Sequence, residues 1–315
     1  MKKNQRGFMD TVMQNRAVTF VVVVLIMFLC AQTSAQDRNA SLPGLTLGVV
    51  AGTHQKEIET HFREFTTYLA RKVSGPAANG GVIVAPTTTD LVQLLQEKKV
   101  DFYLESPYPT YVINDVNGAG TVLARRWKGG MAEYQSLIFT NRNSGITRLQ
   151  DLRGKLVAFE DPESSSGYLL PKLFLQRQGL KLSDQSAGGA TAAEETGYIF
   201  GQTDDKVIEL VLTGRAAAGA FSDDDYARVP PEGKSEIVIL AQTERLPRHL
   251  VSIRNDLPPE IAARLQSVLL SMHEDPEGRR ILQQTDDTTK FDLLPGGEQA
   301  MRRRLLDTFF SPERR

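Results

Sequence analysis

The sequence predicts an α/β protein with two lobes, each a central sheet flanked by helices. Short apolar segments alternate with segments of helical period in two stretches, 45–104 and 137–241, and this alternation is typical of parallel sheets. With 315 residues, 41% of them hydrophobic, the chain can bury two cores. After residue 254 only helical patterns follow, so we expect these helices to return to the first lobe.

The first stretch has the order βαβαβ. Strands are expected at 45–50, 82–86 and 100–104, with helices at 55–72 and 88–98 between them. Short connections of this kind give a parallel sheet with right-handed crossovers. Ligands of such sheets bind beyond the carboxyl ends of the strands.

The later elements divide the chain into lobes. The expected strands are 121–127, 134–140, 156–159, 216–221, 237–241 and 248–254. The helix that starts after the strand 156–159 is expected to end at 178, and further helices are expected at 204–213, 259–273, 276–283 and 297–310. A polar loop is expected at 183–196. Lobe 1 would comprise 36–136 and 246–315, and lobe 2 would comprise 137–245. The two crossings between them would form a hinge, which suits closure over a ligand.

Residues 1–35 have the pattern of a secretory signal peptide. Basic residues precede an apolar run at 17–29, and Thr-Ser-Ala follows it before residue 36. We expect export to the periplasm, with an uncleaved membrane anchor as the alternative. Cys30, the only cysteine of the chain, lies in this leader, so the exported part would have no disulfide. A net charge of −1 gives no indication of nucleic-acid binding.

The segment 159–171, FEDPESSSGYLLP, predicts a strand, a tight turn and a helix start. The first amides of a helix have no partner within it and lie at the positive end of its dipole, so they favour anions. Ser164, Ser165 and Ser166 add hydroxyl groups, and Gly167 would let a ligand approach the backbone. The alternative is an ordinary serine N-cap with two spare serines.

This segment resembles the DP-x-S-T-S-G-Y/F-L-x-P signature of PhnD-like periplasmic binding proteins for phosphonate, phosphite and phosphate. The segments 100–112, 144–171 and 245–282 are similar to other blocks of that family. The resemblance implies the type II periplasmic binding protein fold and a receptor that gives an oxyanion to an ABC permease, as a monomer without a cofactor. It also implies that the three serines bind phosphonate oxygens.

Other positions depart from the family pattern. Thr88 stands where many members have tyrosine, the histidine expected near Thr203 and Asp204 is missing, and His249 replaces a common acidic residue. Thr88, Thr203 and Tyr108 could each make a hydrogen bond, and Arg248 or His249 could supply positive charge or form a solvated hinge surface. Glu105 could accept a proton from a protonated oxyanion. The expected ligand-binding residues are therefore Ser164, Ser165, Ser166, Gly167, Thr88, Glu105, Tyr108, Thr203, Asp204 and His249.

Enzyme and metal motifs are absent from the sequence. There is no G-x-S-x-G around the serines and no H-E-x-x-H, P-loop or G-x-G-x-x-G. The acidic run 223–225 is typical of a helix start rather than a metal site. A binding receptor is thus expected, with a periplasmic ligand sensor of the same fold as the alternative.

Overall fold

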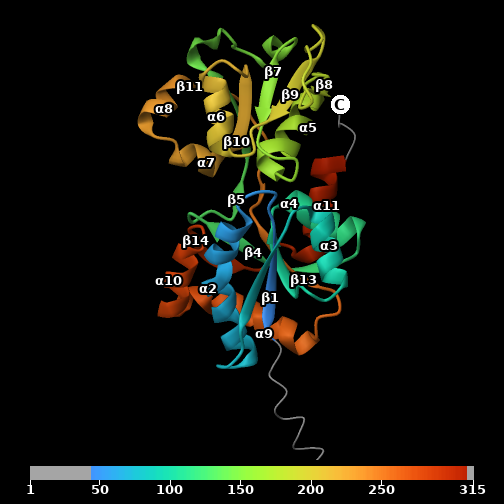
Figure 1. The fold of residues 1–315 in the computed structure, drawn as a ribbon, viewed down its shortest axis with the longest axis vertical. Helices are drawn as coiled ribbons and strands as arrows, with labels where there is room; N and C mark the ends of the chain where they lie inside the picture. The colour runs from blue at the N-terminus through green and yellow to red at the C-terminus, as the bar shows by residue number, and fades with distance from the viewer. Residues whose placement is uncertain (1–43, 311–315) are drawn as a thin grey trace, which may run out of the picture. The chain divides into compact units, whose positions relative to one another are not determined.

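The computed structural model describes residues 44–310, so the expected signal peptide lies outside the described residues. Two six-stranded sheets and one two-stranded sheet are formed within this range. Figure 1 shows each six-stranded sheet with its own helices. No helix within residues 44–310 is both long and apolar enough to cross a membrane.

The first sheet has the strand order β14-β4-β13-β3-β1-β2. Strand β1 is parallel to β2 and β3, and β13, β4 and β14 follow in antiparallel pairs. The bounds are Leu45–Val50 for β1, Gly80–Ala85 for β2, Phe102–Glu105 for β3, Gly120–Lys128 for β4, Leu250–Arg254 for β13 and Thr288–Asp292 for β14. The chain thus returns to this sheet after leaving it, as the helical C-terminal region indicated.

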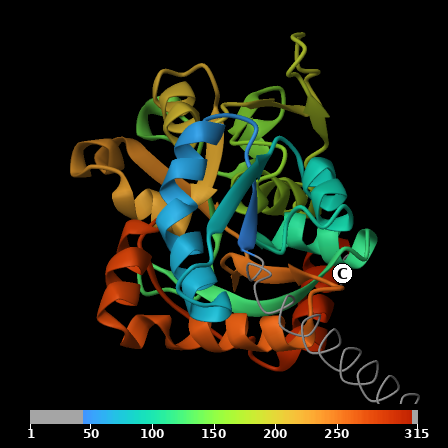
Figure 2. The ribbon, with the colours of Figure 1, turned by 60° about the horizontal axis from the view of Figure 1, so that its bottom comes forward.

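Helices cover both faces of the first sheet. Helix α2 (Gln55–Ser74) packs with α9 (Pro259–Ser271) and α10 (Pro276–Gln284) in one apolar cluster, whereas α3 (Thr88–Gln96) packs in another. Figure 2 shows α2 in blue beside the sheet and α9 and α10 in orange and red. A Cβ atom at Gly80 would lie 2.3 Å from the backbone of Thr66, so only glycine allows β2 to approach α2 this closely.

Strand β14 corrects the expectation that no strand follows residue 254. Its sequence TTKFD places Thr288 and Phe291 in buried positions, and the strand adds to the sheet edge beside β4. The segment is short and follows two residues of positive φ, Asp286 and Asp287. A five-residue edge strand with one large apolar side chain lacks the alternation that would identify it in a sequence.

The second sheet has the strand order β11-β6-β10-β7-β9-β8. Strands β7, β9, β8 and β10 are parallel, and β6 is antiparallel to its neighbours β10 and β11. The bounds are Ser136–Asn141 for β6, Leu156–Phe159 for β7, Leu182–Asp184 for β8, Thr196–Phe200 for β9, Ala218–Ser222 for β10 and Ile237–Gln242 for β11. Strands β8 and β9 were not expected, because small and polar residues flank both.

Helices also cover both faces of the second sheet. Helix α5 (Leu170–Arg177) packs on one face and α6 (Asp204–Leu212) on the other. The short helices α7 (Asp223–Arg228) and α8 (Pro231–Glu236) follow β10. The start of α7 confirms that the acidic run 223–225 opens a helix, capped by the Ser222 hydroxyl, which accepts from the Asp225 N–H at 3.2 Å.

Two chain crossings connect the sheets and pair with each other. The expected strand 134–140 is divided into β5 (Glu133–Tyr134) and β6, and β5 pairs with β12 (Leu246–Pro247). The last helix, α11 (Gly297–Phe310), has the expected bounds and packs beside this ribbon in an apolar cluster with Tyr134, Leu246 and Leu170. An ion pair of 2.5 Å from Arg304 to Glu133 holds the helix there.

Candidate functional site

A cavity of about 400 Å³ lies where strands of both sheets end. The carboxyl ends of β1, β3, β7 and β10 reach it, as expected for parallel α/β sheets. Tyr134 of β5 and the two residues that follow β12, Arg248 and His249, also line it. Of the expected site residues, those that line the cavity are Ser164, Ser165, Ser166, Glu105, Asp204 and His249.

The three serines open the helix that follows β7. Helix α5 is preceded by one π-helical turn, Ser165–Leu169, and Ser164 is its N-cap, with its hydroxyl accepting from the Gly167 N–H at 2.9 Å. In the described chain, the N–H groups of Ser165 and Ser166 make no backbone hydrogen bond outside the helix. Because the first amides of a helix lack partners within it, these groups are available to an anion.

Ser165 also joins the two halves of the cleft. Its hydroxyl accepts from the Tyr108 N–H at 2.8 Å and donates to the Ser106 hydroxyl at 2.9 Å. Both partners follow β3 of the first sheet, whereas Ser165 follows β7 of the second. Ser165 therefore has a structural role in addition to any contact with a ligand.

Gly167 does not serve the role expected from the sequence. It does not line the cavity, and a Cβ atom there would lie 2.4 Å from a carboxylate oxygen of Glu160 and 2.5 Å from the Glu160 Cβ. The Glu160 N–H also donates to the Gly167 carbonyl at 3.0 Å. The glycine thus makes room for the Glu160 side chain rather than for a ligand.

Three other expected residues lie outside the cavity lining. The Thr88 hydroxyl donates to the Glu163 carboxylate, which lies on the opposite side of the cleft. Tyr108 contributes its backbone amide to Ser165, and its ring packs on Phe309 with centroids 5.8 Å apart. Thr203 is the N-cap of α6 and accepts from the Lys206 N–H at 3.2 Å. These three side chains do not line the cavity, and their contact with a ligand stays a prediction.

Glu105 is buried at the end of β3, and the pKa of its carboxyl group is strongly raised. One carboxylate oxygen accepts from the Val50 N–H at 2.6 Å. Burial, together with the negative charge of Glu163, raises the pKa of Glu105 to about 8. The acid is therefore mainly neutral at pH 7 and can donate a hydrogen bond into the cavity.

We expect the melting temperature of the ligand-free protein to fall as the pH rises from about 4.5 to about 8, partly because of Glu105. Its folded-state pKa lies above the ordinary value of 4.5, so its contribution to stability is complete below that value and is lost as the pH passes through about 8. Calorimetry at several pH values would measure this slope. Glu105→Gln cannot ionise and should show a smaller slope, and equal slopes in the two proteins would contradict the assignment.

Carboxyl groups also gather on the second sheet's side of the cavity. Burial raises the pKa of Asp204, and the charges of Glu160 and Asp225 raise it further. Burial likewise raises the pKa of Glu160. One carboxylate oxygen of Asp204 is buried without a hydrogen-bond partner among the described residues. The surroundings of Glu160 and Asp204 therefore favour the protonated form of these two carboxyl groups more than water does.

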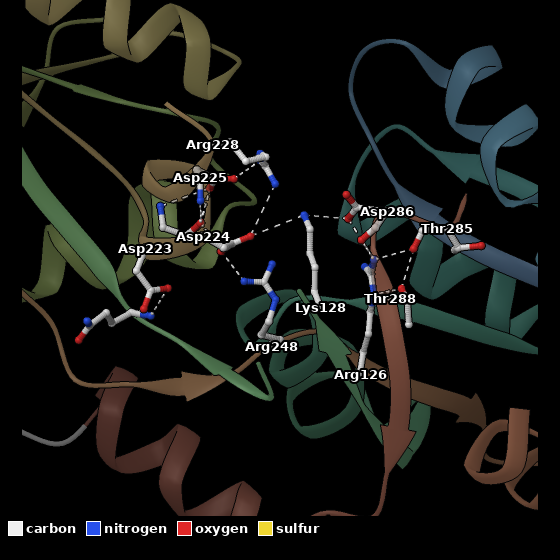
Figure 3. A network of polar contacts seen from close by, with 12 residues as sticks. Arg126, Lys128, Asp223, Asp224, Asp225, Arg228, Arg248, Thr285, Asp286 and Thr288 are labelled. Carbon is white, nitrogen blue, oxygen red and sulfur yellow. Dashed lines mark hydrogen bonds and ion pairs between the residues drawn. The ribbon is translucent and has the colours of Figure 1, made fainter. Parts of the chain in front are cut away.

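A chain of ion pairs crosses the cleft, as Figure 3 shows. Lys128, at the end of β4, lies 2.9 Å from Asp286 on its own sheet and 3.7 Å from Asp224 on α7. Asp224 also accepts from the Arg248 guanidinium and, at 2.6 Å, from the Ser222 hydroxyl. Although burial favours its neutral form, Arg248 lowers the pKa of Asp224 below its usual range.

His249 lies next to this network in its neutral form. Burial lowers its pKa well below 6.5, and the charges of Arg126 and Arg248 lower it further. It can therefore offer a ligand a hydrogen bond but no positive charge. The cations that line the cavity are Lys128, Arg228 and Arg248.

Several lining residues were not expected from the sequence, among them Lys128, Tyr134, Glu160, Asp225 and Asp286. Lys128 ends a strand of the first sheet. Because ligands of such sheets bind beyond the carboxyl ends of the strands, the expected strand 121–127 already indicated this position. Asp286 lies between the expected helices 276–283 and 297–310, where no element was expected, so no sequence signal placed it near the cleft.

Comparison with known proteins identifies the family. The model of the family described as "ABC transporter, phosphonate, periplasmic substrate-binding protein" matches residues 47–294. The chain belongs to this family. The resemblance of the segment 159–171 is thereby confirmed, and the family description names a transport component, which does not favour the alternative of a sensor.

Relatives of this phosphonate-binding family share the fold. XAC2383 from Xanthomonas citri, solved bound to ATP, is 28% identical with a TM-score of 0.75 over 85% of this chain and 96% of that one. PhnD1 from Prochlorococcus marinus, in complex with methylphosphonate, has a TM-score of 0.66 at 17% identity over 85% of this chain and 97% of that one. The fold is that of the type II periplasmic binding proteins.

A curated relative is the phosphate-import protein PhnD of Mycolicibacterium smegmatis. It is 25% identical over 185 residues, which are 57% of this chain. The chain matches about half the length of that relative, 55%.

Proposed function

We propose that this protein captures a phosphonate, phosphite or phosphate anion in the cavity and delivers it to an ABC permease. The main support is the helix start at Ser164–166, where the three serines line the cavity and the N–H groups of Ser165 and Ser166 have no backbone partner outside the helix among the described residues. Amides at the positive end of a helix dipole favour a negative ligand. Glu105, Asp204 and His249 would complete the site.

The ligands of the relatives support a phosphorus oxyanion. XAC2383 was solved with ATP and PhnD1 with methylphosphonate, and both molecules carry oxygens bonded to phosphorus. The conserved shape of the fold allows the same kind of group to lie at the helix start. We propose that the exported protein acts in the periplasm as a monomer.

The lobes would close over the ligand as two units, 36–136 with 246–315 and 137–245. This division is supported by the two sheets and by the crossings at β5 and β12. The contacts Thr88–Glu163 and Tyr108–Ser165 cross the cleft in this structure and would be lost if the lobes opened.

Binding without catalysis is the activity that we propose. A nucleophilic serine needs a base within hydrogen-bond reach. The hydroxyl of Ser164 bonds to the Gly167 amide, and that of Ser165 bonds to Ser106 and the Tyr108 amide. The Ser165 hydroxyl is bonded to no histidine or carboxylate in these contacts, whereas the Ser164 hydroxyl, held as a helix cap, also interacts with the Glu160 carboxylate.

A thermal-shift screen of the full chain tests the proposal. The ligands are phosphate, phosphite, methylphosphonate and aminoethylphosphonate, with sulfate as the comparison anion. A ligand at 100 times its dissociation constant stabilises the folded state by about 2.7 kcal/mol, so at least one phosphorus oxyanion should raise the melting temperature clearly. If none of the four shifts it, or if sulfate shifts it as much as the best of them, the proposed function is wrong.

A further inference from the structure

Arg248 is a buried cation on the hinge that lines the cavity. It follows β12, is 3% exposed, and its N–H donates to the Ala132 carbonyl at 2.9 Å. Its neighbour on the paired crossing, Tyr134, is also 3% exposed and lines the same cavity. The guanidinium is thus fixed by the backbone of the hinge rather than carried on a mobile surface segment.

The guanidinium has unused hydrogen-bonding capacity. Its Nη1 donates to Asp224, and Figure 3 shows the side chain extended toward that carboxylate. Its Nε is buried and has no hydrogen-bond partner within the described residues. A buried donor without a partner is destabilising, and the oxygen of a bound ligand would remove that cost.

The positive charge lies close to the serines. The Arg248 guanidinium stacks on the Tyr134 ring, 4.9 Å from its centroid. The Tyr134 hydroxyl lies beside the hydroxyls of Ser165 and Ser166, yet it makes no well-formed hydrogen bond in the described part of the chain. One tyrosine ring therefore connects the cation to the helix start.

The other two lining cations each have a carboxylate partner as well. Lys128 lies 2.9 Å from Asp286, and Arg228 pairs with Asp225. Both of these side chains are also more exposed than Arg248, whose side chain is 3% exposed against 11% and 57%. Arg248 is consequently the cation that combines burial, a free donor and proximity to the serines.

We propose that Arg248 contacts the bound oxyanion directly and makes the site prefer a doubly charged phosphonate to a singly charged sulfonate of the same shape. This inference depends on the proposed function. The hydroxyls and amides of the helix start are neutral donors, so they distinguish charge states less than a guanidinium does. Asp224 is a positioning residue, because it directs the guanidinium without lining the cavity.

The test compares methylphosphonate with methanesulfonate by titration calorimetry at pH 8.5, where the first carries mainly two charges and the second one. Glu105 is mainly ionised at this pH in the wild type and in the variants alike, so each variant is compared with the wild type at the same pH. Arg248→Gln should weaken methylphosphonate binding about ten- to a hundredfold, since a charged hydrogen bond is lost. Methanesulfonate binding should weaken much less, so the preference between the two ligands shrinks. Arg245→Gln is the matched control, because Arg245 is an exposed arginine on the same crossing that pairs with Asp223, and it should leave both affinities unchanged.

A second variant separates binding from folding. Arg248→Gln leaves Asp224 without its guanidinium, whereas Arg248→Gln with Asp224→Asn removes both charges together. Loss of methylphosphonate affinity in this double variant, with a melting temperature near that of the wild type, supports the assignment. If the wild type binds methylphosphonate and both variants bind it within twofold of the wild type, the role of Arg248 is refuted while the proposed function stands. If the wild type binds none of the phosphorus oxyanions, both are wrong.

Discussion

Asp224→Ala is expected to lower the free energy of unfolding by about 3–5 kcal/mol, the usual cost of removing one partner of a buried ion pair. Asp224 is 8% exposed and its partner Arg248 is 3% exposed. The change would leave the Arg248 guanidinium buried without its counter-charge and would remove the contact with Lys128. Urea unfolding of the ligand-free protein would measure the loss.

Asp223→Ala is the matched control for this prediction. Asp223 precedes Asp224 on the same helix and pairs with Arg245, whose side chain is 41% exposed. Exposed pairs contribute about 0–1 kcal/mol, so this variant should lose far less stability. Equal losses in the two variants would show that the helix start, and not the buried pair, carries the effect.

Replacing Arg248 together with Asp224 should recover part of the stability. In the variant Asp224→Ala, Arg248→Met, no buried charge is left without its partner, and such replacements are often neutral or stabilising. A double-mutant cycle from the four proteins would give the coupling energy of the pair. A coupling energy near zero would contradict the description of a buried, mutually dependent pair.

The double variant Ser165→Ala, Ser166→Ala is expected to weaken oxyanion binding about a hundredfold or more. Each hydrogen bond to a charged group is worth about 1.5–3 kcal/mol, and two hydroxyls are removed. Ser165 also holds Ser106 and the Tyr108 amide across the cleft, so closure should be less favourable as well. Calorimetry with the best ligand of the screen would measure the change.

The single variants separate the hydrogen bonds to the ligand from the effect on closure of the cleft. Among the described residues, the Ser166 hydroxyl forms no hydrogen bond across the cleft, although it lines the cavity, so Ser166→Ala should report the ligand contact. Ser165→Ala should weaken binding and also loosen the closed form, which small-angle scattering with ligand present can detect. Ser186→Ala, in an exposed loop after β8, should change neither the ligand affinity nor the closed form. Unchanged affinity in the double variant would exclude the serines as the anion site.

The fold and the helix start could be predicted because their signals are local. The residues 159–171 contain a strand, a turn and a capping serine in direct succession, and each depends only on near neighbours. The same holds for α11, whose bounds follow from one continuous helical pattern. Strands β9 and β14 were missed because they are short and have polar flanks. Their side chains are buried by tertiary packing, which a local sequence pattern does not indicate.

The charged part of the site could not be predicted in the same way. Lys128, Asp224 and Asp286 come from positions far apart in the chain, and they meet only because the two sheets face each other. Thr88 was expected to face a ligand, but its short side chain reaches Glu163 instead. Similarly, Gly167 was read as an approach for a ligand, whereas the Glu160 side chain occupies that space.

The pairing of β5 with β12 determines which parts of the cleft can move. Within residues 44–310, the polypeptide passes between the two sheets at these two crossings, where Leu246 pairs with Tyr134 and Pro247 with Glu133. If the lobes close as proposed, the change in the angle between the sheets would be absorbed by this narrow ribbon, which would act as a pivot. Residues on this ribbon, including Tyr134 and the residue after Pro247, would then be displaced least, and the parts of each sheet that lie furthest from it would be displaced most.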